Sequence, residues 1–197
     1  NLSGDRFLYE NHVSTAGRER VEWFGTACCP PNLMRTVLSL GGYIYTQQQD
    51  TVTMNLYIGN EADFSLAQGD LHLSVTSGFP WDGKVSITAS AAGGRRMKFR
   101  LRLPSWANGE YTLTVNGESV SDGVDGQGYI VLDRVWENGD TVVLELPMEV
   151  QSIGLMEGTE AAESYTAFRR GPVVYCAEEV DNETRPNQYY IAKDAAF

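Results

Sequence analysis

The sequence predicts a mainly β protein, an antiparallel β-sandwich preceded by a short helical segment. Three observations lead to this fold class. Beyond Gly42, apolar and polar residues alternate in many short stretches, and turns rich in glycine separate these stretches. Before Gly42, only one stretch has apolar residues at helical spacing. Many short strands with frequent turns are typical of a sandwich or barrel, and we expect a sandwich because no pattern of barrel closure is visible.

The alternation is clearest in residues 97–103, "MKFRLRL", where apolar side chains occupy every second position and Lys or Arg the positions between. Residues 51–58, 70–76, 111–115 and 141–146 repeat this period of two. Such a period indicates strands with one buried and one solvated face. The residues expected on the buried faces include Val52, Met54, Leu56, Ile58, Leu71, Leu73, Val75, Met97, Phe99, Leu101 and Leu103.

Turn sequences separate these strands. "ANGE" at 107–110, "VNGE" at 115–118, "SDGVDGQG" at 121–128 and "ENGD" at 137–140 all combine Asn or Asp with Gly. Asn-Gly and Asp-Gly readily adopt the left-handed backbone angles that tight turns require. The aspartates Asp82, Asp122, Asp125 and Asp140 lie in these or similar turns; their spacing fits no calcium loop, so we expect solvated turn residues.

A helix is predicted over residues 30–42, "PPNLMRTVLSLGG". Pro30 and Pro31 suit a first helical turn, where a missing N–H group costs little. Gly41 and Gly42 are expected to end the helix. Because this helix is short and has little polar surface, we expect it to pack inside a larger structure.

Composition excludes several classes of partner. The 197 residues carry a net charge of −11, which argues against nucleic acid and against an anionic membrane surface. No run of 18 apolar residues is present, so no membrane-spanning segment is predicted. A neutral ligand remains compatible with this charge.

The chain divides into two unequal parts, a segment at 1–41 and a β-sandwich domain at 42–197. "NLSGDRFLYEN" at the start is similar to the interior of a longer protein, so we expect the chain to be a piece of one.

Cys28 and Cys29 are adjacent and lie just before the predicted helix. A disulfide between neighbouring cysteines is strained and is not expected. The positive end of a helix stabilises a thiolate, which favours nucleophilic chemistry, and two thiolates can supply half of a tetrahedral zinc site. The alternative is a pair of small buried apolar side chains.

The segment "EWFGTACCPPNLMRT" at 22–36 resembles the cysteine motif of glycoside hydrolase family 127, the β-L-arabinofuranosidase family, and of its relative family 146. "GFPWDGKV" at 78–85, "FRLRLPSWA" at 99–107 and "FRRGPVVY" at 168–175 resemble the sandwich that follows the catalytic barrel in those enzymes. The resemblance thus covers most of the chain, and "CCPPN" is its most specific element.

This resemblance implies a six-hairpin α/α barrel with attached β-sandwich domains, so residues 1–41 would be the end of the barrel. It implies a retaining exo-glycosidase that acts on an arabinofuranoside. By this resemblance Cys28 would be the nucleophile and a zinc ligand, and Cys29 a second zinc ligand. The chemistry is coherent, because cleavage with retention needs a nucleophile on one face of the sugar and a proton donor on the other.

The family places a third cysteine, a zinc-binding glutamate and a glutamate that acts as acid and base before the cysteine pair. Residues 1–27 contain no cysteine, so we expect these groups, and the helical barrel that carries them, outside this chain. The chain alone is expected to be inactive and to bind zinc weakly. Cys176, in "PVVYCAEE", is predicted to be structural and to lie in a buried strand.

Other candidate residues have competing structural interpretations. Glu19 and Glu22 are expected to form surface ion pairs with nearby arginines rather than to act as acid and base. His12 is compatible with a sugar pocket or a loop hydrogen bond, whereas His72 is expected on the solvated face of a strand. Aromatic residues near the motif and at strand ends suit either sugar stacking or packing; these are Trp23, Phe24, Trp81 and Trp106.

Two functions are therefore predicted. The first is a part of a cysteine-dependent, zinc-supported retaining glycosidase whose sandwich supports the barrel. The second is a non-catalytic carbohydrate-binding or structural β-sandwich module.

Overall fold

The structure is a computed structural model of the whole chain. It describes residues 3–9, 18–26, 28–91, 94–121, 123–156, 158–159, 165–182, 185 and 188–192. The chain divides into two compact units, one formed by Asn1–Gly41 with Ala177–Ala196 and the other by Gly42–Cys176 with Phe197. Ala177–Ala196 are not part of the second unit, because they group with the N-terminal residues. The assignment of 1–41 to the end of a larger domain and of 42–197 to a sandwich domain stays a prediction.

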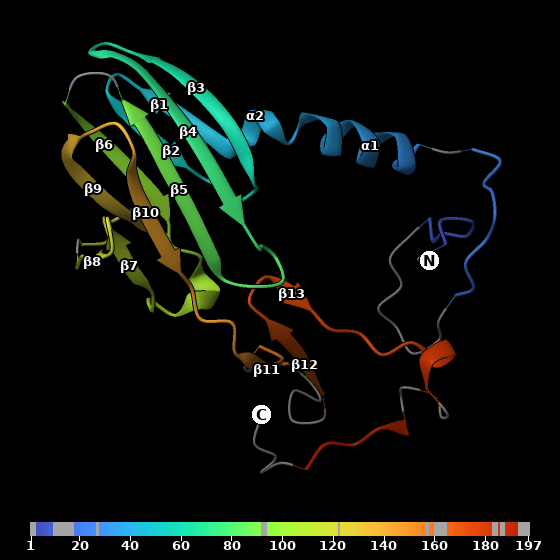
Figure 1. Cartoon of the computed structure of the whole chain (residues 1–197). Helices are drawn as coiled ribbons and strands as arrows, with labels where there is room; N and C mark the ends of the chain where they lie inside the picture. Colours follow the sequence, from blue (N-terminus) through green and yellow to red (C-terminus); the bar gives the residue numbers. More distant parts are fainter. Residues whose placement is uncertain are drawn as a thin grey trace. The chain divides into compact units, whose positions relative to one another are not determined.

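The second unit contains two sheets that face each other as layers (Figure 1). One sheet has the strand order β1-β2-β6-β9 and the other the order β3-β4-β5-β10-β7-β8. This arrangement confirms the mainly β fold class and the sandwich. The strands of the first sheet are β1 (Tyr45–Gln48), β2 (Thr51–Met54), β6 (Arg95–Arg102) and β9 (Tyr129–Trp136). Those of the second are β3 (Asn60–Leu66), β4 (Gly69–Ser77), β5 (Lys84–Ala91), β7 (Thr112–Val115), β8 (Glu118–Ser119) and β10 (Asp140–Glu145).

The pairing is antiparallel in both sheets with one exception among the pairs that the structure describes. Strands β2 and β6 run parallel, with Val52 opposite Phe99. Parallel neighbours need a long connection, and here the chain forms β3, β4 and β5 of the opposite sheet before it returns. A period of two predicts the faces of a strand but not the direction of its neighbour, so the sequence did not predict this pair.

The core lies between the two sheets and follows the predicted alternation. Leu71, Leu73 and Val75 of β4 are buried, as are Met97, Phe99 and Leu101 of β6. The prediction was wrong at the end of the first strand. There β2 stops at Met54, Tyr57 is buried, and Ile58 is exposed. At this point the N–H groups of Asn55 and Leu56 both point to the carbonyl of Ile44, at 2.7 and 3.4 Å, so the one-to-one pairing of β2 with β1 ends here.

The Asn-Gly turns adopt the expected backbone angles. Asn116 and Gly117 both have positive φ and join β7 to β8 in a tight hairpin. The turn at 137–140, in which Gly139 has positive φ, connects β9 to β10, which belong to different sheets. This turn therefore moves the chain from one layer of the sandwich to the other.

A smaller sheet follows the sandwich within the second unit. It has the order β11-β12-β13, formed by β11 (Val150–Gly154), β12 (Thr166–Arg170) and β13 (Val173–Val174). The prediction for Cys176 was wrong, because β13 ends at Val174 and Cys176 is exposed beyond it. A continuous apolar run is typical of a buried strand, but no layer of the described residues covers this one.

Helical structure is concentrated before the sandwich. Helix α1 spans Cys29–Ser39 and α2 spans Gly41–Ile44, while single 3-10 turns occur at η1 (Ser105–Ala107) and η3 (Glu179–Asp181). The predicted stop at the two glycines was wrong, because α1 already ends at Ser39 and Gly41 and Gly42, neither of which has positive φ, begin α2. No residue of α1 is buried among the described residues, so the expected packing of its apolar side is not provided by them. None of the described helices is long and apolar enough to cross a membrane.

Candidate active site

The cysteine pair lies at the start of α1, as the sequence predicted. Cys28 is the N-cap residue and Cys29 the first residue of the helix, and prolines follow in the first turn. Cys28 has helical backbone angles, and the N–H of Asn32 points to its carbonyl oxygen at 3.4 Å. Both thiols are exposed and free, so the interpretation as buried apolar side chains is wrong.

The separation of the two sulfur atoms fits two ligands of one metal ion. Cys28 Sγ and Cys29 Sγ lie 3.8 Å apart. A tetrahedral zinc ion with Zn–S bonds of about 2.3 Å would hold two sulfur ligands about 3.8 Å apart. No group of three or more His, Cys, Asp and Glu side chains suited to a metal exists within the described ranges. These two thiols therefore fit half of a zinc site.

Tyr9 contacts Cys28 at two atoms. The tyrosine oxygen lies 2.6 Å from Cys28 Sγ and accepts a hydrogen bond of 3.3 Å from the backbone N–H of the same cysteine. Because a thiolate has no hydrogen to donate, the hydroxyl donates to the sulfur when Cys28 is ionised. Tyr9 was not among the residues that the sequence identified as candidates. Nothing in the pattern distinguishes it from the other nine of the ten tyrosines, because the contact joins residues 19 positions apart.

These contacts act on the ionisation of the thiol. The hydrogen bond from the Tyr9 hydroxyl, followed by that from Cys29, lowers the pKa of Cys28 below the usual value of a thiol. The same bond raises the pKa of Tyr9, so the hydroxyl keeps its proton. The helix N-terminus adds a favourable partial positive charge. A thiolate is the reactive form of cysteine, and these contacts favour the thiolate form of Cys28.

Aromatic packing holds the segment that carries Tyr9. The ring of Phe24 packs edge-on against the ring of Tyr9, with ring centres 4.7 Å apart. It also packs against the ring of Phe7, with ring centres 5.1 Å apart. Phe7 also exchanges two backbone hydrogen bonds of 3.0 Å with Val21. Phe24 therefore helps to anchor the loop, and the other role that the sequence left open for it, contact with a sugar, stays a prediction.

Tyr9 also lines a cavity of about 420 Å³. Its other walls are Leu8, Arg18, Glu19, Val21, Phe24, Gly25 and Thr26. The cavity combines aromatic, apolar and charged groups, the mixture with which proteins bind small polar ligands. Because Tyr9 contacts both this cavity and Cys28, the cavity and the thiol are neighbours.

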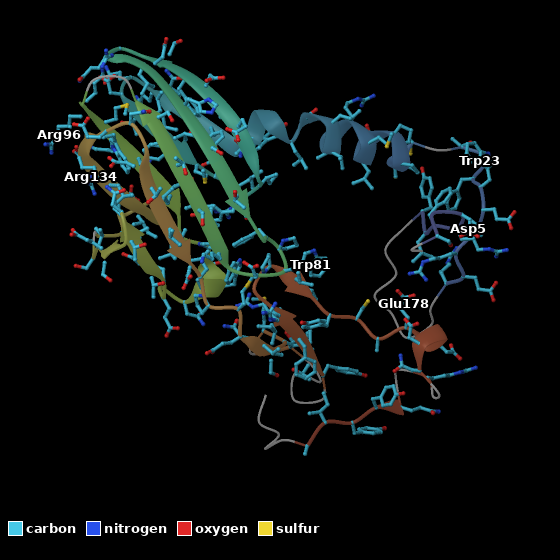
Figure 2. All side chains as sticks on the ribbon, viewed as in Figure 1. Asp5, Trp23, Trp81, Arg96, Arg134 and Glu178 are labelled. Atoms are coloured by element: carbon cyan, nitrogen blue, oxygen red, sulfur yellow. The ribbon has the colours of Figure 1, made fainter. Side chains whose placement is uncertain are left out.

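A second, apolar groove of about 700 Å³ runs along α1. Its walls are Phe7, Trp23, Phe24, Pro30, Pro31, Met34, Arg35 and Leu38. Trp23 is labelled in Figure 2 and is 77% exposed, so it does not serve as a packed anchor among the described residues.

The glutamates near the motif differ in their surroundings. Glu22 forms an ion pair with Arg6 at 2.9 Å, which confirms the surface role predicted for it. Glu19 is exposed and lines the cavity beside Tyr9. His12 lies outside the described residues.

An ion pair joins the C-terminal residues to this unit. Arg20 donates two hydrogen bonds, of 2.6 and 2.8 Å, to the carboxylate of Glu178 (Figure 2 labels Glu178). These bonds lower the pKa of Glu178. The contact spans 158 positions, which explains why sequence patterns did not reveal it.

The remaining candidates lie on the sandwich. His72 is on the solvated face of β4, as predicted, with its ring nitrogens 2.8 Å from Asp63 and 2.9 Å from Glu61. Trp106 packs against the core, whereas Trp81, on the loop between β4 and β5, is 72% exposed (Figure 2).

The turn aspartates are structural. Asp82 accepts a hydrogen bond from the N–H of Lys84, and Asp125 binds the guanidinium of Arg100. Asp140 is buried, so the prediction of a solvated turn residue was wrong there. It caps the turn by accepting the N–H of Glu137. Asp122 lies outside the described residues.

Comparison with known proteins places these features in a family. Residues 51–148 match the model described as "Beta-L-arabinofuranosidase, GH127 middle domain", and residues 150–197 match "Glycoside hydrolase family 127 C-terminal domain". The boundary between the two models falls just before β11 and separates the sandwich from the three-stranded sheet.

A curated relative is the non-reducing end beta-L-arabinofuranosidase of Bifidobacterium longum subsp. longum. It is 38% identical to this chain over an alignment that covers 92% of this chain and 30% of the relative. The chain thus spans about a third of that relative's length.

Solved structures agree in fold. A GH127 beta-L-arabinofuranosidase from Geobacillus stearothermophilus T6 has a TM-score of 0.77 and 38% identity, over 83% of this chain and 26% of that one. A second structure, described as a GH127 beta-arabinofuranosidase, has a TM-score of 0.82 and 33% identity, over 92% of this chain and 31% of that one.

Proposed function

Because the chain belongs to glycoside hydrolase family 127, we propose that it is the C-terminal part of a retaining β-L-arabinofuranosidase whose nucleophile is Cys28. Cys28 and Cys29 would hold a zinc ion together with ligands from outside this chain. The helical barrel domain that completes the active site would supply those ligands and the proton donor. By itself the chain would be inactive.

The observation that carries this proposal is the geometry of the two thiols. They are exposed, they lie 3.8 Å apart at a helix N-terminus, and the sulfur of Cys28 bonds to the Tyr9 hydroxyl. Two sulfur ligands of one zinc ion need this spacing, and a nucleophile needs an accessible thiolate.

The reaction would proceed in two displacements at the anomeric carbon. The Cys28 thiolate attacks that carbon, a C–S bond forms, and the bond to the leaving oxygen breaks while a general acid outside this chain protonates it. Water, deprotonated by the same group, then displaces the sulfur and restores the thiolate. A zinc ion, when bound, would keep its thiol ligands ionised at neutral pH.

Side chains near Cys28 suit the recognition of a sugar. The cavity of about 420 Å³ beside Tyr9 offers the guanidinium of Arg18 and the carboxylate of Glu19, which can bind hydroxyl groups. Its aromatic wall is formed by Tyr9 and Phe24, and aromatic rings pack against the apolar faces of sugars.

The test is made on the complete polypeptide that carries these residues, with an aryl β-L-arabinofuranoside as substrate. We expect release of L-arabinose by the unsubstituted enzyme and a loss of activity on Cys28→Ser with folding retained. As a control, Cys176→Ser replaces an exposed cysteine outside the pair and should leave the activity unchanged. Full activity of Cys28→Ser would contradict the proposal.

A second function is favoured by one observation, the exposed Trp81 on the β4–β5 loop of the sandwich. An exposed tryptophan can serve as a platform for a sugar ring, so the sandwich could bind polysaccharide without catalysis. Affinity electrophoresis of this chain in gels that contain arabinan tests this. Retardation that Trp81→Ala abolishes would support binding, and unretarded migration would exclude it.

A further inference from the structure

We propose that Tyr9 is a positioning residue that fixes the orientation of the Cys28 sulfur for attack. The inference rests on the proposed function, in which Cys28 is the nucleophile. It assigns a role to a residue that neither the motif nor its spacing identified.

The first argument is that one oxygen atom bonds to two atoms of the same residue. The Tyr9 hydroxyl lies 2.6 Å from Cys28 Sγ and 3.3 Å from Cys28 N. Rotation about the Cα–Cβ bond of Cys28 would move the sulfur while the backbone nitrogen stays in place. The paired contacts therefore select a single staggered rotamer of the cysteine.

The second argument is that the hydroxyl group is itself held in place. The ring of Tyr9 packs edge-on against Phe24, and Phe24 packs against Phe7. Phe7 is in turn paired through its backbone with Val21. These three successive contacts hold Tyr9 in place, and Tyr9 in turn holds the sulfur of Cys28. The orientation of a reacting atom contributes strongly to the rate of a reaction.

Other restraints on this side chain are weaker among the described residues, where its sulfur also lies 3.8 Å from Cys29 Sγ. Cys28 is the N-cap residue of α1, but its side chain makes no capping hydrogen bond to the helix backbone. The thiol is also exposed, so close packing does not fix its rotamer. Of the two described contacts of the sulfur, that with the Tyr9 hydroxyl is the shorter and therefore the stronger restraint.

The test is Tyr9→Phe in the complete enzyme, which removes the hydroxyl and keeps the ring against Phe24. We expect kcat to fall by about tenfold to a hundredfold, the rate equivalent of one hydrogen bond to a charged group. We expect KM to stay within about twofold, because the lost contact is made to the nucleophile and not to the substrate. Tyr43→Phe, at an exposed tyrosine of α2, is the matched control and should leave both constants unchanged.

A crystal structure provides a readout that does not depend on activity. In the metal-free unsubstituted enzyme, Tyr9 Oη should lie within hydrogen-bond distance of Cys28 Sγ. In Tyr9→Phe the sulfur should occupy a different or a mixed rotamer. A separation beyond about 3.5 Å in the unsubstituted enzyme would overturn the inference even if the variant does not fold.

The outcomes separate this inference from the proposed function. If Cys28→Ser is inactive and Tyr9→Phe retains its kcat, the role of Tyr9 is wrong and the proposed function stands. If Cys28→Ser remains fully active, both are overturned.

Discussion

The two compact units differ in how far their own residues bury their apolar side chains. In the Gly42–Cys176 unit, the inward faces of both sheets meet in one continuous core that includes Trp136, Phe99 and Leu144. In α1 of the other unit, Leu38 is 82% exposed and no residue of the helix is buried among those described. The same apolar side-chain types are therefore covered in one unit and left open in the other.

The unit that is stabilised by its own core is therefore not the unit that carries the candidate active site. Burial of apolar area is the main source of folding free energy, so the sandwich is the part that this chain can stabilise by itself. The thiols and Tyr9 lie in the other unit, which contributes the exposed groove along α1. The candidate active site thus belongs to the unit with the smaller core of its own.

The largest loss of stability is expected when a large side chain is removed from the core of the sandwich. Trp136 is 0% exposed, packs against Phe99 with ring centres 5.1 Å apart, and donates its indole N–H to the carbonyl of Met97. Trp136→Ala should lower the free energy of unfolding by about 3–5 kcal/mol, the usual cost of deleting a large buried side chain. Urea denaturation followed by circular dichroism measures this.

Two control substitutions remove apolar side chains that are exposed, for comparison with the buried Trp136. Trp81→Ala removes the same side chain from an exposed loop, and Leu38→Ala removes an apolar side chain from α1. Both should change the stability of the sandwich by less than about 0.5 kcal/mol. A cost for Leu38→Ala as large as that of Trp136→Ala would mean that the two units do not differ as described.

The second-largest loss of stability is expected at Asp140, a buried carboxylate of the sandwich. It accepts hydrogen bonds from the N–H of Glu137 at 2.9 Å and the amide of Asn116 at 2.8 Å. Asp140→Ala should destabilise the sandwich by about 1–3 kcal/mol, because both donors lose a charged partner. Thermal unfolding followed by calorimetry at neutral pH checks this.

The pH dependence of this site has a definite sign. Burial tends to raise the pKa of Asp140, but the hydrogen bonds from Glu137 and Asn116 outweigh it, and the net pKa is lowered. A carboxylate with a lowered pKa in the folded state stabilises the fold above its unfolded pKa, and this contribution is lost as the pH falls through the folded pKa. The difference in Tm between the unsubstituted chain and Asp140→Ala should therefore shrink upon acidification.

A smaller effect is expected in the unit that carries the cysteines. Glu178 pairs with Arg20, whose hydrogen bonds lower the pKa of this carboxyl group. Its contribution is present above the unfolded pKa and is lost as the pH falls through the folded value. Glu178→Gln should therefore speed amide hydrogen exchange in residues 18–26 at about pH 7 and have less effect at about pH 3. Equal exchange in both proteins at neutral pH would contradict this.

The smallest effect is expected at His72, on the solvated face of β4. The hydrogen bond with Asp63, followed by contacts with Glu61, raises the pKa of this imidazole. A raised pKa stabilises the fold below the unfolded pKa, and this contribution is lost as the pH rises through the folded pKa. His72→Gln should thus lower Tm more at about pH 5 than at about pH 9. Ser90→Ala, on the neighbouring strand β5 directly opposite His72, is the control.

Several features could be predicted from the sequence because they are local. Alternation in "MKFRLRL" predicted that Met97, Phe99 and Leu101 are buried, and the consecutive prolines predicted the start of α1. The adjacency of Cys28 and Cys29 made them candidates for metal binding, since neighbouring residues cannot be far apart. Each of these conclusions depends on the geometry of a few consecutive residues.

Only the tertiary structure decided the features that join distant positions. The parallel pairing of β2 with β6 and the exposure of Cys176 depend on which segments pack together, as does the contact of Tyr9 with Cys28. A period of two or 3.6 shows which side of a strand or helix is apolar, but not what covers that side. For this protein the sequence therefore determined most of the elements and the position of the cysteine pair, whereas long-range packing determined their neighbours.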